Sequence, residues 1–112
     1  MAIKCEDYNN VCVMALDGDL TGDLPAIVRK LADERVERKQ IVDFVLDFEK
    51  AGFFDSEGLE TLLWLKRRAE DLFGQLKLVN LDENCKKILE ITRLEPQFES
   101  HVDLTGALKT MR

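Results

Sequence analysis

The sequence predicts a single α/β domain over residues 1–112, with the element order ββαβαβαβα. Two observations carry this prediction. Short segments rich in β-formers alternate with amphipathic segments of helical period, and Asp, Asn, Gly or Pro residues separate them. Strands that alternate with helices form a mostly parallel sheet with helical cover. We expect about five strands and four helices, with an antiparallel hairpin of the first two strands at one edge.

The first strand is predicted at residues 2–7, where apolar and polar side chains alternate weakly. The turn Tyr8-Asn9-Asn10 suits asparagine, which tolerates positive φ. Residues 11–16 are apolar throughout, as in a strand buried on both faces. A helix follows to about Glu37, with Asp23 as its N-cap and Pro25 in its first turn. Its apolar stripe consists of Leu24, Ile27, Val28 and Leu31.

The central strand is predicted at Ile41 to Phe48, and a helix runs from the turn around Ser56 to about Phe73. Gly74 suits the carboxyl end of that helix. A helical wheel places one apolar cluster at Leu59, Leu62, Leu63, Ala69 and Phe73. The opposite, polar side carries Trp64 together with Glu57, Thr61, Arg68 and Asp71.

The last third of the chain repeats the alternation. Residues 76–81 form a strand, and Asp82 caps a short helix whose buried side chains are Ile88, Leu89 and the following Leu94. Gln97 to Val102 is a short polar strand at the other edge. Asp103 caps a final helix with the stripe Leu104, Ala107, Leu108 and Met111.

Composition excludes several classes of function. The formal net charge is −6, and no basic run offsets it, so we expect no nucleic-acid partner. No signal peptide or membrane-spanning run is present, which favours a cytoplasmic protein without membrane insertion. The three cysteines share no metal-ligand or redox spacing and are expected to be free, buried thiols: Cys5, Cys12 and Cys85.

Ser56 lies between a buried strand and an amphipathic helix, which is where α/β proteins place working groups. Two interpretations compete. Serine is a good helix N-cap, and composition alone favours that role. Ser56 could instead accept a phosphate, because a helix amino end tolerates negative charge. With Asp55, Glu57 and Glu60 nearby in the sequence, a phosphate would make the surface strongly anionic.

The sequence contains no motif that predicts an enzyme. A nucleophilic serine needs an adjacent base, and the one histidine, His101, follows much later on a polar strand. Phe54 and Gly58 stand where a Gly-x-Ser-x-Gly elbow needs two glycines. No Walker-type lysine loop and no Cys/His cluster occurs, so we expect no catalysis, no cofactor and no metal.

A second loop, Asp17 to Asp23, carries two glycines, three aspartates and a threonine. Capping and solubility explain it as well as a cation site or a nucleotide site does. If the preceding strand runs parallel to the central one, this loop meets the Ser56 turn at the carboxyl edge of the sheet. Trp64 is a second candidate, either an interface anchor or an ordinary surface aromatic that a small change of register would bury.

Several segments together resemble the STAS-domain family, shared by bacterial anti-sigma factor antagonists and the cytoplasmic parts of sulfate transporters. They are Ile41–Asp47, Phe53–Leu59, Leu76–Leu81, Ile88-Leu89 and Thr92–Leu94. The resemblance covers essentially the whole chain, and its most specific part is the Asp-Ser-x-Gly-Leu turn.

The resemblance implies a phospho-switched binding protein of the anti-sigma factor antagonist type. Such a protein binds an anti-sigma factor that is also a serine kinase, and so releases a sigma factor. Phosphorylation of the serine in the turn, here Ser56, breaks the complex, and a phosphoserine phosphatase restores it. Self-association as a weak homodimer is left open. An alternative is a STAS adaptor subunit of a larger signalling or lipid-transport assembly, in which Ser56 is only a cap.

The resemblance also assigns a partner-binding surface around the phosphoacceptor. Asp55 would support the turn, and Gly58 would let the partner approach closely. The loop with Asp19, Thr21 and Asp23 would flank this surface, and we add Trp64 as a candidate anchor. Two positions depart from the family pattern. Glu57 stands where a small residue is common, and Thr21 stands where an acidic one is common.

Overall fold

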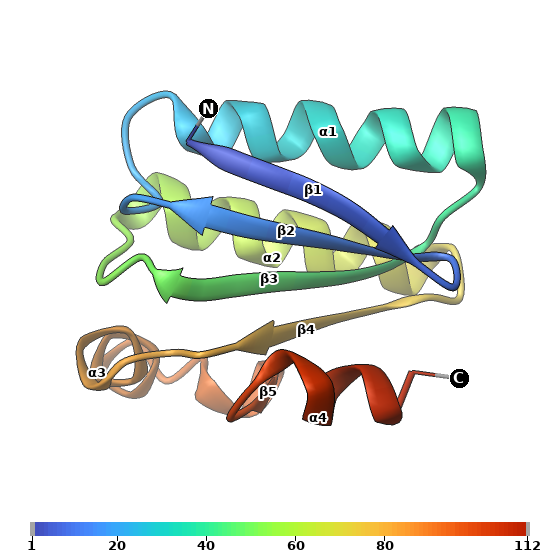
Figure 1. Cartoon of the computed structure of the whole chain (residues 1–112). Helices are drawn as coiled ribbons and strands as arrows, with labels where there is room; N and C mark the ends of the chain where they lie inside the picture. The colour runs from blue at the N-terminus through green and yellow to red at the C-terminus, as the bar shows by residue number, and fades with distance from the viewer. Residues whose placement is uncertain (1, 112) are drawn as a thin grey trace.

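The computed structural model describes residues 2–111, which form one five-stranded sheet and four α-helices (Figure 1). The order ββαβαβαβα is as predicted. The strands are β1 (Ile3–Tyr8), β2 (Val11–Asp17), β3 (Asp43–Lys50), β4 (Gln75–Val79) and β5 (Glu99–His101). The helices are α1 (Leu24–Lys39), α2 (Ser56–Asp71), α3 (Glu83–Ile91) and α4 (Leu104–Lys109), and a short 3-10 turn, η1, spans Glu95–Gln97.

The strands lie in the sheet in chain order, β1-β2-β3-β4-β5. β1 pairs antiparallel with β2, and all other neighbours are parallel, which confirms the predicted edge hairpin. Because each parallel connection moves one strand further in the same direction, right-handed crossovers place α1, α2 and α3 on one face. α4 packs on the other face, in front of the sheet in Figure 1.

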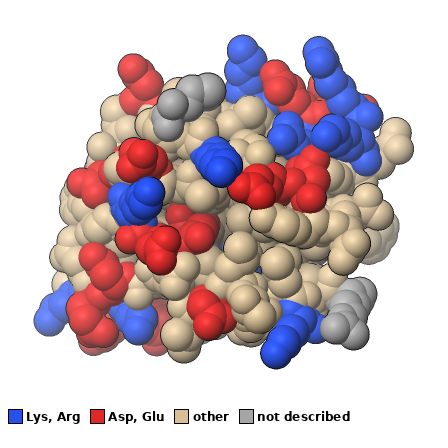
Figure 2. All heavy atoms as spheres, in the orientation of Figure 1, with Lys and Arg blue, Asp and Glu red and all other residues tan. Residues whose placement is uncertain are grey.

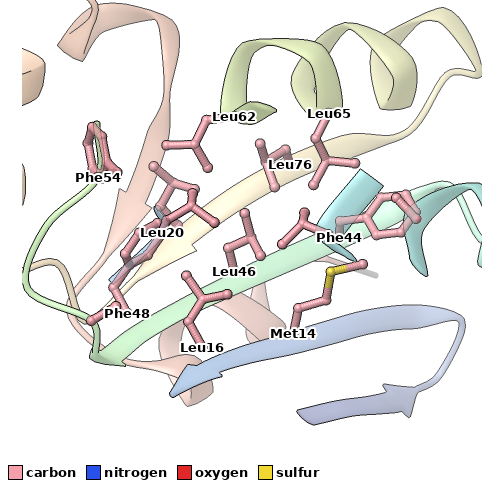
Figure 3. Packing of buried hydrophobic residues seen from close by; sticks show 14 of the residues in the cluster. Met14, Leu16, Leu20, Phe44, Leu46, Phe48, Phe54, Leu62, Leu65 and Leu76 are labelled. Atoms are coloured by element: carbon pink, nitrogen blue, oxygen red, sulfur yellow. The ribbon is translucent and has the colours of Figure 1, made fainter. Parts of the chain in front are cut away.

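The larger core fills the space between the sheet and α1, α2 and α3. Figure 3 shows Leu46 and Phe44 of β3 pointing toward Leu62 and Leu65 of α2, and all four side chains are fully buried. The smaller core lies under α4 and consists of valines from three strands with two residues of the C-terminal segment. They are Val11, Val13, Val45, Val79, Ala107 and Met111. A strand buried on both faces needs apolar residues at consecutive positions, which explains the continuous apolar run of β2.

The β1–β2 hairpin turns at Asn9 and Asn10, whose φ angles are +49° and +66°. A two-residue hairpin turn of type I′ needs positive φ at both central positions, and asparagine accepts this at low cost. The predicted turn is confirmed. The turn also sets the register, in which Cys5 lies opposite Met14 and Asp7 lies opposite Cys12.

The structure confirms two of the three aspartates predicted to cap helices. Asp82 and Asp103 cap α3 and α4 as predicted, each through a 2.8 Å hydrogen bond from a backbone N–H. Asp23 does not cap α1 with its side chain, because its own backbone is already helical, with φ −83° and ψ −16°. An N-cap side chain reaches the first turn from an extended backbone. Ser56, the cap candidate for α2, is described with the candidate site.

The predicted wheel of α2 is wrong at two positions. Thr61 was expected on the polar side and is fully buried, because α2 packs on α1 as well as on the sheet. Phe73 was expected in the apolar cluster and is 99% exposed. The helix ends at Asp71, and Phe73 adopts a left-handed conformation with φ +65°. Gly74 follows it, where a Cβ would stand 1.9 Å from the carbonyl oxygen of Val42.

Within residues 2–111, no helix combines the length and the apolar character that crossing a membrane requires.

Candidate functional site

The two loops singled out in the sequence meet at the carboxyl edge of the sheet, as predicted. Leu20, in the β2–α1 loop, forms a parallel β-bridge with Phe54, in the β3–α2 loop. The Leu20 amide donates a 3.0 Å hydrogen bond to the carbonyl of Phe53. Leu20 and Phe54 are both buried, so a hydrophobic contact seals the junction (Figure 3). The β3–α2 loop is therefore joined to the β2–α1 loop at Phe53 and Phe54.

Two side chains hold the start of the β3–α2 loop at Gly52. The Gly52 amide donates to Oδ1 of Asp19 at 3.0 Å, and Nδ2 of Asn84 donates to the Gly52 carbonyl at 2.8 Å. These side chains come from the β2–α1 loop and from α3, on either side. A Cβ at Gly52 would lie 3.2 Å from Oδ2 of Asp82, so little room is left there. Asp19 therefore braces the loop from one side, and Asn84 braces it from the other.

Ser56 is not the N-cap of α2. Asp55 takes that position with an extended backbone, and its Oδ1 accepts a 2.9 Å hydrogen bond from the Gly58 amide. Ser56 is the first helical residue and is exposed. Because Asp55 supplies the cap, the helix does not need the Ser56 hydroxyl for that purpose. The hydroxyl lies at the amino end of a sixteen-residue helix, where the backbone dipole favours negative charge.

Gly58 has an internal role. It is buried, and a Cβ at this position would stand 2.3 Å from the Leu20 carbonyl oxygen and 2.9 Å from Cβ of Phe54. Glycine thus allows the first turn of α2 to pack directly on the bridge between the two loops. The structure gives Gly58 this internal packing role, and the close approach of a partner at Gly58 stays a prediction.

Trp64 is half-buried rather than exposed, as a small change of helix register would give, and its role as an interface anchor stays a prediction. It packs against the core, and the guanidinium carbon of Arg29 lies 5.6 Å from its ring centroid. Nε of Arg29 also donates a 3.0 Å hydrogen bond to the buried Thr61 hydroxyl. Arg29 of α1 thus links two residues of α2, and this contact explains why the predicted polar side of α2 is covered.

The surface around Ser56 is acidic. Asp19, Asp23 and Glu57 are exposed, and Thr21 is half-buried. A shallow groove between α1 and α2 lies beside them, lined by Gly22, Pro25, Ala26, Arg29, Glu57, Glu60 and Thr61. In Figure 2, Asp and Glu side chains predominate toward the side where β2, β3 and β4 end, whereas Lys and Arg side chains gather near the opposite end of α1. A negative partner surface would be repelled here.

Sequence reasoning missed two residues of this site, Asn84 and Phe53. Asn84 is an ordinary polar residue in the first turn of a helix, and nothing in the local pattern indicates that it reaches the loop at Gly52. Phe53 is 41% exposed beside the buried Phe54, so it adds an apolar side chain to the surface near Ser56. Within the described residues, no group of three or more His, Cys, Asp or Glu side chains could hold a metal ion.

A model of the STAS domain matches residues 2–107, nearly the whole chain. The chain belongs to the STAS domain family. Its Asp55-Ser56-Glu57-Gly58 turn and the loops around it are therefore those of a STAS domain.

Named relatives support the same fold. The chain is 22% identical to the anti-sigma F factor antagonist of Paenibacillus polymyxa over 114 residues, which cover 99% of this chain and 97% of the relative. The crystal structure of TM1081 from Thermotoga maritima has a TM-score of 0.90 at 15% identity, covering 98% of this chain and 94% of that one.

The anti-sigma factor antagonist SpoIIAA is also similar. Its unphosphorylated form has a TM-score of 0.82 at 22% identity, covering 97% of this chain and 95% of that one. The phosphorylated form, from Bacillus, has a TM-score of 0.77 at 21% identity, covering 99% of this chain and 100% of that one. Since these identities are below 25%, the likeness to solved structures establishes the fold.

Proposed function

We propose that this STAS domain is an anti-sigma factor antagonist that is switched by phosphorylation of Ser56. In its unmodified form it binds an anti-sigma factor that is also a serine kinase, and it thereby releases a sigma factor. Phosphorylation of Ser56 ends the interaction, and a phosphoserine phosphatase restores it. The domain acts as a binding protein and does not catalyse a reaction.

The observation that carries this proposal is that Asp55 caps α2, which leaves the Ser56 hydroxyl free of that role. Asp55 makes the capping hydrogen bond to Gly58, so the exposed Ser56 hydroxyl is available to a kinase without loss of the cap. The names of two similar proteins, an anti-sigma F factor antagonist and a phosphorylated SpoIIAA, support the same role.

The electrostatics support a switch that acts on binding. A phosphate adds about −1.5 to −2 charges at neutral pH, and the helix amino end tolerates this charge. The exposed carboxylates of Asp23 and Glu57 already make the neighbourhood negative. A partner that covers Ser56 would therefore have to dehydrate a highly charged group inside the interface, which opposes binding. The braced loop would keep its shape, so the fold would survive the modification.

The test is intact-mass analysis with site mapping on protein purified from its own cells under several growth conditions. A fraction that is heavier by one phosphate, located at Ser56, is the expected result. Ser56→Ala should then bind the cognate anti-sigma factor constitutively, and Ser56→Asp should bind it weakly. Equal affinity of both variants for that partner would contradict the switch.

The alternative is an adaptor within a larger assembly, without phosphorylation. It would be favoured if Ser56 carried no phosphate under any condition and if Trp64→Ala, rather than Ser56→Asp, abolished assembly. The cover of Trp64 by Arg29 weakens this alternative, because a half-buried ring offers a partner less surface than an exposed one.

A further inference from the structure

α4 covers only part of its face of the sheet. On the outer strand β1, the half-buried Cys5 points toward the larger core, so the alternating side chains Lys4, Glu6 and Tyr8 point to the α4 face. Beside α4, this part of the face forms an open groove of about 380 Å³. The groove crosses β1, β2 and β3 and reaches Leu104, the first residue of α4. Figure 2 shows the molecule from this side.

The floor of the groove is aliphatic and low. Ala15 of β2 is half-buried, and the register places it between Lys4 of β1 and Asp47 of β3. The buried Val13, two positions earlier on the same strand, continues the floor. Because Ala15 carries only a methyl group, the space above the strand stays open between longer side chains. The floor therefore suits the hydrocarbon part of a guest side chain.

The rim of the groove is acidic. Four carboxylates line it against two ammonium groups, and these residues are Glu6, Asp17, Asp47 and Glu49, with Lys4 and Lys50. Nζ of Lys4 lies 3.3 Å from Oε1 of Glu6, so this cation is already paired, whereas Lys50 opposes the binding of a cation. Oδ1 of Asp47 accepts hydrogen bonds from the Glu49 amide and from Nδ2 of Asn80, each at 2.9 Å, which fixes this carboxylate at the groove.

Two side chains of the rim are available to a partner. Glu49 is exposed and forms no salt bridge within residues 2–111. Tyr8 is 42% exposed, and its hydroxyl donates a hydrogen bond to the Glu6 carboxylate, which holds the ring at the rim. Tyrosine is common among the residues that dominate binding energy, and its ring face attracts cations. The groove thus combines an aliphatic floor, an aromatic ring and an excess of negative charge.

We propose that this groove is a docking site for a basic segment of a partner protein, one that alternates arginine or lysine with apolar residues. The aliphatic stem of an arginine lies over Ala15 and Val13, and its guanidinium binds the carboxylates of Asp47 and Glu49. α2, which begins at Ser56, packs on the other face of the sheet. The proposal is therefore independent of the proposed function, and the two surfaces could be occupied together.

The test measures the affinity of the full chain for a short fluorescein-labelled peptide of alternating arginine and leucine, by fluorescence anisotropy. Salt at about 0.15 M limits the reach of the overall charge of −6 to about 8 Å. Ala15→Leu should weaken binding at least about fivefold, because the larger side chain fills the floor and leaves the charge unchanged. Glu49→Gln should weaken it about two- to fivefold, because it removes one exposed ion pair.

Two matched variants separate the groove from general attraction between an acidic protein and a basic peptide. Ala26→Leu makes the same substitution in the groove between α1 and α2, and Glu83→Gln removes an exposed carboxylate from α3. Both should bind the peptide as the wild type does. Unchanged binding by Ala15→Leu, or equal losses in Glu49→Gln and Glu83→Gln, would overturn the proposal.

NMR titration of the wild type with the same peptide locates the bound segment without any substitution, and it replaces Ala15→Leu if that variant does not fold. Saturable shifts of the Val13 and Leu104 methyl signals are expected, whereas shifts confined to α1 and α2 would contradict the site. Sedimentation equilibrium of the chain alone excludes another occupant. A dimer that Ala15→Leu dissociates would assign the groove to a second copy of this chain and overturn the proposal.

Discussion

Replacing Asp55 and Ser56 one at a time distinguishes a structural cap from a free hydroxyl. Asp55→Ala removes the acceptor of the 2.9 Å hydrogen bond from the Gly58 amide at the start of α2. Loss of an N-cap side chain costs about 1 kcal/mol of unfolding free energy, within a range of about 0.5 to 2. Ser56→Ala removes an exposed hydroxyl at the first helical position and should cost less than about 0.3 kcal/mol, because alanine is the better helix former.

The assay is thermal and urea unfolding of the unphosphorylated proteins. For a chain of 112 residues, a loss of about 1 kcal/mol corresponds to a fall in Tm of about 4 °C. We therefore expect Asp55→Ala to melt about 4 °C below the wild type, and Ser56→Ala to melt within about 1 °C of it. The slope of the urea transition should be unchanged, since the buried area is the same.

Asp82→Ala is the matched control, because Oδ1 of Asp82 caps α3 by accepting a 2.8 Å hydrogen bond from the Cys85 amide and lies outside the Ser56 turn. It should cost about as much as Asp55→Ala. If Ser56→Ala destabilised the protein as strongly as Asp55→Ala, the Ser56 hydroxyl would be part of the cap. The argument that a kinase can use this hydroxyl without disturbing the helix would then be refuted.

Two further predictions concern packing and charge. Gly58→Ala should lower stability by about 1–3 kcal/mol in urea unfolding, because its Cβ would overlap the Leu20 carbonyl at 2.3 Å; unchanged stability would contradict that packing. A hydrogen bond from Lys77, and to a lesser extent one from His101, lowers the pKa of Glu99 below its ordinary value of 4.5. The Lys77–Glu99 ion pair therefore contributes its full stability above pH 4.5 and loses it as the pH falls through the lowered pKa. Glu99→Gln removes the carboxylate that pairs with the buried Lys77 and leaves the Thr110 hydroxyl as a partner; it should cost about 1–2 kcal/mol at pH 7 and progressively less below pH 4, and a cost independent of pH would contradict the ion pair.

The order of elements was predictable because each depends on local chemistry. Asn9-Asn10 accepts positive φ, the apolar run of β2 requires burial on both faces, and Asp82 and Asp103 stand alone as cap candidates. The β2–α1 and β3–α2 loops meet because parallel strands end at the same edge. These properties need no knowledge of distant contacts.

The sequence did not predict the N-cap of α2, the burial of Thr61 or the contact of Asn84, because each depends on backbone conformation or on a distant segment. Asp55 and Ser56 are adjacent and both can cap a helix; only the backbone at Asp55 decides between them. A helical wheel finds one apolar stripe, whereas α2 contacts both the sheet and α1, which buries Thr61 under Arg29. The brace from Asn84 to Gly52 depends on two segments 32 positions apart, and no local pattern reveals it.

The carboxyl end of α2 was also mispredicted, because it depends on a contact outside the helix. Phe73 continues the apolar period of the helix, so the pattern counts it as buried. The chain leaves the helix after Asp71, and Gly74 is needed where the backbone passes Val42. That steric requirement involves Val42, just before β3, and lies outside the helix, so the pattern of the helix cannot reveal it.

The most direct test of the proposed switch is the affinity of the cognate anti-sigma factor kinase for two samples of this protein. One sample is unmodified, and the other is phosphorylated quantitatively at Ser56; both are measured by isothermal titration at the same salt concentration. We predict that phosphorylation weakens binding by at least about tenfold, corresponding to about 1.4 kcal/mol, while the Tm changes little. Equal affinity of the two samples would contradict the account.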